Sequence, residues 1–362
     1  MIFLAGCATT PSPDESLPPD WSTNGVVAKP FSVTNSMPMP TITKINLPPV
    51  IIHSNPPPVT IVKPRPAAPI LTWTSLNRWV AENQIGSLHW LTGGPVTSYS
   101  ISAKNGVLVL GIGSREATWR GMEIHLGFAP EIIDDQVFIH GLDLQKNLEP
   151  LLLGEPLMFP GPHRVIVIDP GHGGIQSGTI SVLDKRPEKE FTLDWARRLK
   201  PLLETNGWQV FLTRTSDADV SLSNRVAFAE AHRADLFVSL HFNSLAPDQK
   251  PVGLETFCLT PMGMPSTLTR GYPDILFQNF PNNNFDAQNL QLAAQLHRAL
   301  LHATGLEDRG VSHARFIGVL RGQHRPAVLV EAGFLSNPRE ARRIEDPEFR
   351  QKLAEAVAEV LK

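Results

Sequence analysis

The sequence is poor in cysteine, in long apolar runs and in excess charge of either sign. Its 362 residues include only two cysteines, and the formal net charge is −3. Two cysteines exclude a small fold that is stapled by several disulfides. No apolar run reaches the length of about 18 residues that a membrane-spanning helix needs. The near-neutral charge argues against a general nucleic-acid binder, which would carry a concentrated basic surface, so we expect no nucleic-acid partner.

Proline, in contrast, is abundant, with 33 residues in the chain. Many of them lie between residues 8 and 70, in clusters such as Pro56-Pro57-Pro58. Proline lacks a backbone N–H and favours an extended polyproline II conformation. We therefore expect residues 8–70 to form a semi-rigid linker, at about 3.1 Å per residue where fully extended. The chain is long enough for two domains besides this linker.

The first seven residues end in a short motif, Leu4-Ala5-Gly6-Cys7, that resembles the bacterial lipobox. The basic and apolar parts that precede such a box are missing, so we interpret residues 1–7 as a truncated lipoprotein signal. The simplest explanation is a start codon assigned too late. Acylation of Cys7 would attach the chain to a membrane of the bacterial cell envelope, on the periplasmic side. The alternative is a cytoplasmic protein in which this motif occurs by chance.

Residues 71–157 have a globular composition, and their pattern predicts a small α+β domain. Short β-type runs occur at 98–101, 107–112 and 136–139, between helical patterns at 76–83 and 142–152. This order resembles the small stalk domain first named from copper amine oxidases. His89, His125 and His140 have irregular spacing, so we interpret them as ordinary surface or core residues and infer no copper site.

Three later apolar runs, each typical of a strand buried on both faces of a mainly parallel sheet, end in polar residues. The run at 165–168 leads into Asp169-Pro170-Gly171-His172, and the run at 236–240 leads into His241. The run at 327–330 ends in Glu331, and a lone glutamate there is costly unless it is paired or functional. Ligand sites in α/β proteins lie at the carboxyl ends of such strands, so these side chains should meet at one edge.

A helical pattern supplies a further carboxylate. Phe191, Trp195 and Leu199 repeat at helical spacing, and Pro187 directly precedes the helix that they predict. Glu188 then falls in the first turn, facing the histidine loop. Two histidines and a carboxylate are a common set for catalytic zinc, which leaves one coordination position for water. Because the three residues are far apart in the sequence, their spacing alone is weak support.

Four segments together resemble the zinc-dependent N-acetylmuramoyl-L-alanine amidases of the type-3 amidase family. They read DPGHGG, EKEFTLDWA, SLHFNS and VLVEAGFLSN, and the resemblance extends over about residues 164–362, which covers essentially the whole catalytic domain predicted at 163–362. It implies a three-layer α/β domain with a mostly parallel sheet and helices on both faces. It also implies a peptidoglycan substrate, Zn²⁺ as the cofactor, metal ligands at His172, Glu188 and His241, and a catalytic Glu331. The bond cleaved would be the amide between N-acetylmuramic acid and L-alanine.

The family places its ligand glutamate just before a lysine, which favours Glu188 over Glu190. These two residues lie about 200° apart around a helix, so both cannot face the metal. We interpret His232 as a surface residue and Cys258 as a buried free thiol. The other histidines of the domain are predicted to be structural or surface residues; they are His297, His302, His313 and His324.

The segment at 246–286 interrupts the domain and is rich in loops and aromatic residues. We interpret it as a substrate-binding or lid loop, with surface decoration or autoinhibition as alternatives. Two other functions stay open at this point: another zinc peptidase acting on the wall peptide, and a non-catalytic wall-binding lipoprotein. The sequence identifies no protein activator.

Overall fold

The computed structural model describes residues 72–91, 94, 96–155, 157 and 164–362, all within one compact unit. The predicted signal segment at 1–7, with Cys7, and the predicted linker at 8–70 lie outside the described residues. The same is true of residues 158–163, where the boundary between the two globular regions is predicted. Among the described residues, no helix is long and apolar enough to cross a bilayer.

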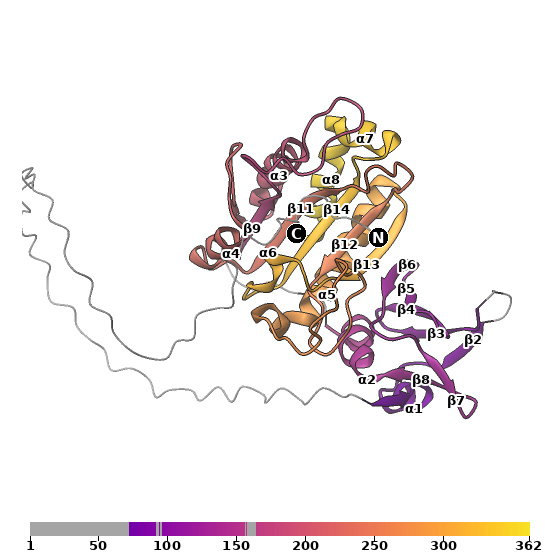
Figure 1. Cartoon of the computed structure of the whole chain (residues 1–362). Coiled ribbons are helices and arrows are strands. Elements are labelled where there is room, and N and C mark those ends of the chain that lie inside the picture. Colours follow the sequence, from indigo (N-terminus) through magenta and orange to yellow (C-terminus); the bar gives the residue numbers. More distant parts are fainter. Residues whose placement is uncertain (1–71, 92–93, 95, 156, 158–163) are drawn as a thin grey trace, which may run out of the picture. The chain divides into compact units, whose positions relative to one another are not determined.

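A mostly parallel sheet forms the middle layer of the region after residue 163, as the sequence predicts (Figure 1). Its strands lie in the order β10, β9, β11, β14, β12 and β13, and among these neighbours only β14 and β12 run antiparallel. β11 and β14 are buried along their whole length, as their continuous apolar runs predict. The bounds are β9 Arg164–Pro170, β10 Trp208–Leu212, β11 Leu236–Asn243, β12 Leu254–Cys258, β13 Asp308–His313 and β14 Ala327–Phe334.

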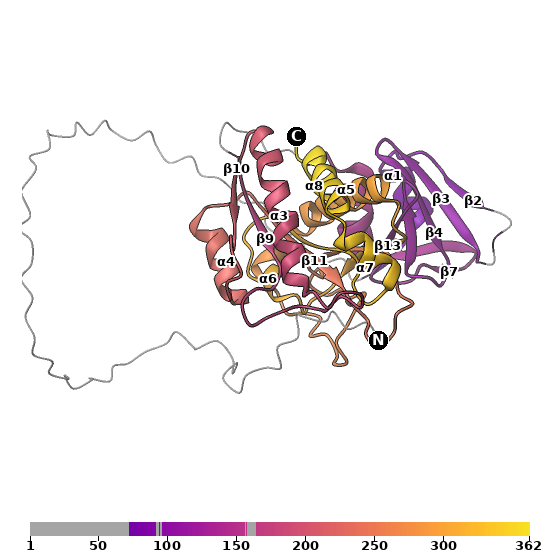
Figure 2. The same ribbon diagram turned by 90° about the horizontal axis from the view of Figure 1, so that it is seen from above.

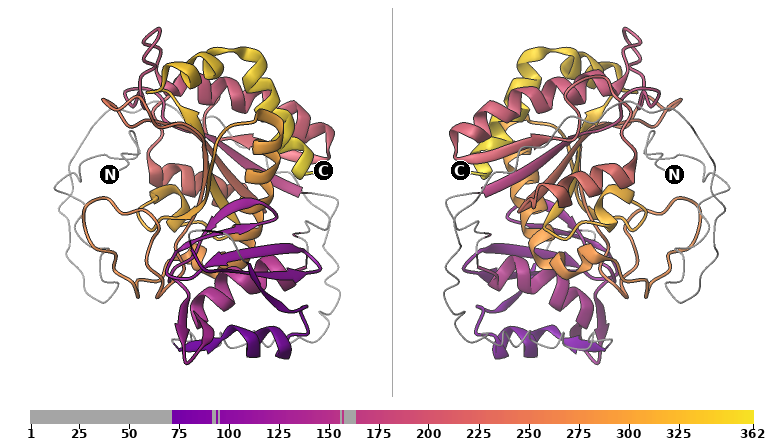
Figure 3. Two further views of the ribbon diagram at one scale, coloured as in Figure 1. Left: turned by 90° about the vertical axis from the view of Figure 1, so that its right-hand side faces the viewer. Right: turned by 90° about the vertical axis from the view of Figure 1, so that its left-hand side faces the viewer.

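Helices cover both faces of this sheet and complete three layers (Figure 3). Alternate residues of a strand point to opposite faces, so Ile166 and Ile168 pack with α3, α5, α7 and α8, whereas Val167 packs with α4 and α6. Figure 2 shows α3, α8 and α5 side by side across the first face. The bounds are α3 Glu188–Thr205, α4 Leu222–Ala231, α5 Asp286–Thr304, α6 Gly318–Arg321, α7 Pro338–Glu345 and α8 Pro347–Val360, with a 3₁₀ turn at Pro281–Phe285 before α5.

The five strands between residues 88 and 125 extend the same sheet. β6 pairs in parallel with β13 through Ile124 and Val311, and β5, β4, β3 and β2 follow in antiparallel order. The segments predicted as strands are β3, β4 and β8, and the predicted first helix is α1. The bounds are β1 Trp73–Ser75, α1 Leu76–Glu82, β2 Leu88–Leu91, β3 Ser98–Ala103, β4 Gly106–Gly111, β5 Glu116–Trp119, β6 Met122–His125, β7 Glu131–Ile133 and β8 Gln136–His140, with β1, β8 and β7 in a second, small sheet.

The helical pattern at 142–152 is only partly the α-helix that the sequence predicts. A short helix α2, Gly141–Asp143, continues into a π-helix over Leu144–Leu153. Pro150 lies inside this π-helix and has no N–H to donate to the preceding turn. Its ring also crowds an α-helical turn, so a wider turn is a physical way to keep the apolar face buried.

A buried chain of hydrogen bonds connects this π-helix to β13. The Nε2 atom of His313 lies 3.1 Å from Oδ1 of Asn147, and its Nδ1 atom lies 3.3 Å from Sγ of Cys258. Asn147 in turn donates to the Asp143 carboxylate at 2.7 Å. A neutral His313 ring can satisfy both neighbours, since one nitrogen donates to Asn147 and the other accepts from the thiol. Cys258 is a buried free thiol, as predicted, and burial raises its pKa.

This environment predicts a pH dependence of stability. Burial, with a smaller effect of His125, lowers the pKa of His313 to about 4, below the 6.5 of a free histidine. The unfolded chain therefore binds a proton between these two values that the folded chain does not. The stabilisation by neutral His313 is complete above pH 6.5 and is lost as the pH falls toward 4, by on the order of 3 kcal/mol.

The measurement compares the free energy of unfolding of the parent chain and His313→Gln at pH 7 and pH 4.5, both treated with a chelator. The free energy of unfolding of the parent should exceed that of the variant at pH 7, and this difference should disappear at pH 4.5. An exposed control, His302→Gln, should follow the parent at both pH values. An unchanged difference between parent and His313→Gln would contradict the prediction.

Candidate active site

The first candidate residue, His172, lies in a tight loop directly after β9. Its φ is +62°, in the left-handed region, and the next residue, Gly173, has φ +129°. Before this turn, Gly171 donates its N–H to the carbonyl of Leu240 at 3.1 Å, which extends the pairing of β9 with β11. The glycines allow the chain to reverse beside the sheet edge, so the His172 ring, which is buried, turns toward the site.

The register between β11 and β14 brings the next two candidates together. His241 and Glu331 are directly paired across these parallel strands, so their Cα atoms are neighbours. Both side chains are buried, with exposed fractions of 5% and 4%. Oε2 of Glu331 has no hydrogen-bond partner among the described residues. A buried carboxylate oxygen without a partner is costly, so Glu331 does not serve stability and is a candidate for a role in the chemistry of the site.

Glu188 enters the same site from the first position of α3. Its Oε1 atom accepts hydrogen bonds from Nδ1 of His241 and the backbone N–H of Phe242, both at 3.0 Å. Its Oε2 atom accepts from the backbone N–H of Thr179 at 3.0 Å and lies 3.1 Å from Nε2 of His172. The positive end of the helix dipole favours a carboxylate at this position.

His172, Glu188 and His241 each offer one ligand atom, and these atoms all lie within 4.8 Å of one another. Burial alone would raise the pKa of Glu188, but the two histidine rings outweigh it and hold the pKa well below its usual range. Burial lowers the pKa of His241. The resulting protonation states, an ionised carboxylate and a neutral imidazole, are those that bind a metal.

The residues present fit a zinc ion. Two imidazoles and one carboxylate are the donor types of catalytic zinc sites. The surrounding backbone leaves no room for larger residues: a Cβ on Gly171 would lie 2.2 Å from the His241 ring, and one on Gly178 would lie 2.5 Å from Oε2 of Glu188. These two glycines therefore allow the loop backbone to pack directly against the ligand side chains.

The structure separates the other candidates from this set. Glu190, the alternative to Glu188, is exposed and pairs with Arg186 at 2.9 Å. His232 packs between Phe211 and Phe228 and is not part of the group of potential ligands. His297 is buried but bonded to Thr256 and Asp308, in a structural role.

Glu255 was not identified from the sequence, although it lies beside Glu331. The two residues are directly opposite in the antiparallel pair of β12 and β14, with Cβ atoms about 5 Å apart in such a pair. Burial, then Glu188 and Glu255, raise the pKa of Glu331 well above its ordinary value. The signal was available, because Glu255 is a lone carboxylate within the apolar run of β12, as Glu331 is in β14.

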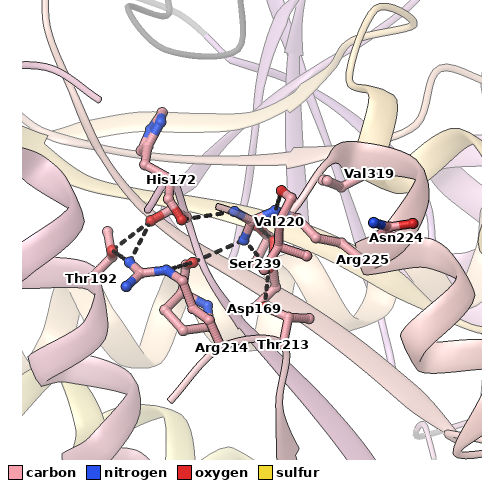
Figure 4. A network of polar contacts seen from close by, with 12 residues as sticks. Asp169, His172, Thr192, Thr213, Arg214, Val220, Asn224, Arg225, Ser239 and Val319 are labelled. Carbon is pink, nitrogen blue, oxygen red and sulfur yellow. Dashed lines mark hydrogen bonds and ion pairs between the residues drawn. The ribbon is translucent and has the colours of Figure 1, made fainter. Parts of the chain in front are cut away.

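A buried polar network lies behind the His172 loop (Figure 4). Asp169, the last residue of β9 before Pro170, accepts from Nη1 of Arg225 and from Oγ1 of Thr213, both at 2.5 Å, and from Oγ of Ser239 at 2.8 Å. Arg214 completes the network from the loop after β10. Asp169 and Ser239 lie in segments that carry the family resemblance, but the sequence did not indicate that these residues are connected to one another.

The segment at 246–286 contributes β12 and then a long loop. Arg315 anchors this loop by donating to the carbonyls of Pro261, Met264 and Gln278, at 3.0, 2.8 and 3.2 Å. Three large side chains between the anchored residues Met264 and Gln278 are exposed, namely Tyr272, Ile275 and Phe277. Such apolar exposure suits contact with a ligand or partner, but the role of the loop stays a prediction.

A three-layer α/β fold with a buried His₂Glu group and an adjacent carboxylate is the arrangement expected of a metal-dependent hydrolase. Residues 166–362 match the family described as N-acetylmuramoyl-L-alanine amidase, and the chain belongs to that family.

Named relatives agree with this membership. The chain is 35% identical over 238 residues to the N-acetylmuramoyl-L-alanine amidase AmiC of Escherichia coli (strain CFT073), covering 59% of this chain and 56% of the relative. It is 31% identical over 221 residues to AmiA of Escherichia coli K12, covering 55% of this chain and 75% of the relative. The chain thus spans little more than half the length of AmiC. The catalytic domain of CwlV from Bacillus (Paenibacillus) polymyxa superposes with a TM-score of 0.45 and 31% identity, covering 54% of this chain and 95% of that domain.

The geometry of the site predicts that Glu188, and not Glu190, contributes to metal binding. Glu188→Gln should lower the affinity for Zn²⁺ by at least about tenfold, since it removes a charged donor between two histidines. The matched control Glu190→Gln, two positions along the same helix, should bind as the parent chain does. Competition with a chromophoric chelator measures both affinities, and a loss confined to Glu190→Gln would reverse the assignment.

Proposed function

We propose that this chain is a zinc-dependent hydrolase that cleaves the amide between the lactyl group of N-acetylmuramic acid and L-alanine in peptidoglycan. Its membership of the amidase family supports the substrate and the bond. The observation that carries the chemistry is the buried group of His172, Glu188 and His241, with Glu331 paired to His241 in the adjacent strand.

In this proposal His172, Glu188 and His241 hold the zinc ion and leave a coordination position free. Zinc bound there supplies Lewis acidity, which polarises a carbonyl oxygen and lowers the pKa of water. The chain's own contribution is a rigid donor set: the carboxylate of Glu188 bonds two backbone N–H groups, so it cannot rotate away from the histidines.

Glu331 is proposed to move the proton. Its carboxylate accepts a proton as the oxygen of water bonds to the carbonyl carbon, and then donates it to the leaving nitrogen as the C–N bond breaks. The products are the lactyl carboxylate and a free L-alanine amine. Burial and the neighbouring carboxylates, which raise its pKa, make Glu331 a stronger base and suit this double role.

We further propose that the protein is a periplasmic lipoprotein of a bacterial cell envelope, attached through Cys7. The lipobox-like motif and the proline-rich residues 8–70 support an anchor followed by a spacer. Residues 71–157 would be a small α+β domain and residues 163–362 the catalytic domain. The loop within 246–286 would contact the substrate, because its exposed apolar side chains include Tyr272 and Phe277.

Digestion of purified peptidoglycan with the full chain, with and without a zinc chelator, tests the proposed reaction. Mass spectrometry should find stem peptides with a free L-alanine amine, and only without chelator. Products cut within the peptide would instead indicate a zinc peptidase. An absence of products from protein that holds zinc would indicate a wall-binding role or inhibition by the 246–286 segment.

The role of Glu331 gives a separate prediction. Glu331→Gln should retain zinc but lower kcat by roughly 10²–10⁴-fold, because the variant cannot carry a proton. Glu255→Gln is the matched comparison, a buried glutamate on the neighbouring strand, and should lose less activity. Zinc content and kcat of both variants are measured together, and the reverse ranking would move the role to Glu255.

A further inference from the structure

Two buried arginines hold the loop that carries His172 by its main chain. Arg225 donates to the carbonyl of Pro170 at 3.0 Å and to that of His172 at 2.7 Å. Arg214 donates to the carbonyl of Pro170 at 3.0 Å and to that of Gly171 at 2.8 Å. Every carbonyl from Pro170 to His172 therefore accepts from a guanidinium. Figure 4 shows Arg214 and Arg225 beside His172.

Arg214 also ties this loop to the helix that carries Glu188. Its Nη2 atom donates to the carbonyl of Lys189 at 2.8 Å and to Oγ1 of Thr192 at 3.0 Å. The same hydroxyl donates to the carbonyl of Gly171 at 2.8 Å. One guanidinium thus connects the residue after Glu188 with the residue before His172.

The loop needs such support because its own conformation is unfavourable. A left-handed residue other than glycine costs about 1–2 kcal/mol, and His172 adopts that conformation. Electrostatics alone would not select arginines here, since two cations behind a cation site repel the metal. Asp169 offsets one of these charges through its pair with Arg225. The arginines instead fix the conformation of the loop, because each planar guanidinium bonds several carbonyls at once.

We propose that Arg214 and Arg225 are positioning residues for the metal site, which fix the backbone of His172 and the first turn of α3 so that the ligands converge before metal binds. The proposal rests on the metal set of the proposed function. Neither arginine donates to the ligand side chains of His172, Glu188 or His241 in any hydrogen bond seen among the described residues, so both would act through the main chain.

The test measures Zn²⁺ affinity of the full-length chain by competition with a chromophoric chelator. Arg225→Lys keeps the charge but loses the planar fork, and it should weaken zinc binding by about 10–100-fold, the effect typical of residues behind metal ligands. Arg350→Lys is the matched control. Arg350 is also buried and also bonds a carboxylate and a carbonyl, those of Asp194 and Ile344, but it lies on α8. It should lose a similar amount of stability and keep the parent affinity.

A second pair of substitutions, which are less disruptive, tests the same inference if Arg225→Lys does not fold. Thr192→Val removes only the hydroxyl shared by Arg214 and Gly171, whereas the control Thr256→Val removes a buried hydroxyl bonded to His297. Thr192→Val should weaken zinc binding several-fold more than Thr256→Val. It should also change the visible spectrum of the Co²⁺-substituted protein, which reports ligand geometry and is insensitive to stability alone.

The outcomes separate this inference from the proposed function. A parent chain that binds no zinc would overturn the proposed metal site itself. A parent that binds zinc tightly, with Arg225→Lys and Thr192→Val matching their controls in affinity and Co²⁺ spectrum, would overturn only the positioning role. Weaker binding in both test variants, at unfolding temperatures equal to those of their controls, would support it.

Discussion

The parallel register of β9, β11 and β14 is the constraint on which the site depends. Because side chains alternate along a strand, a shift of one residue would turn His241 or Glu331 to the opposite face. The register is fixed by apolar residues on both sides of the sheet, in the two clusters that contain Ile168 and Val167. The chemistry at the edge is therefore stabilised by packing several residues away from it.

Buried charge is the main cost of this arrangement. Glu188, Asp169 and Glu331 are all buried, and the three carboxylates differ in the partners that compensate their charge. Glu188 is compensated by two histidines and two backbone N–H groups, and Asp169 by Arg225 and two hydroxyls. Glu331 has one oxygen without any hydrogen-bond partner among the described residues, unlike the carboxylates of Glu188 and Asp169.

Much of this could be predicted from the sequence where a local pattern determines the structure. The continuous apolar runs predicted β9, β11 and β14, because a strand that is buried on both faces is apolar at every position. Helical periodicity predicted α3, because a helix that is buried on one face repeats its apolar residues at helical spacing. The choice of Glu188 over Glu190 came from family resemblance, and the structure places only Glu188 beside the histidines. The contacts of Arg214 and Arg225 could not be predicted, because they join main-chain atoms across elements and depend on no side-chain pattern. The π-helix was missed because a helical repeat does not distinguish wider turns.

The pairing of β6 with β13 was also not predicted, and it determines how the edge of the main sheet at β13 is completed. β13 would otherwise be an edge strand, with unpaired N–H and C=O groups open to another chain. β6 pairs with it only at Ile124, but Glu123 adds a bond from its N–H to the Asp308 carboxylate at 2.8 Å. Beside it, His313 bonds to Asn147 from the π-helix. The described residues before 157 thus cover the edge with both strand pairing and buried polar contacts, so their removal would expose β13 as well as the polar groups that they satisfy.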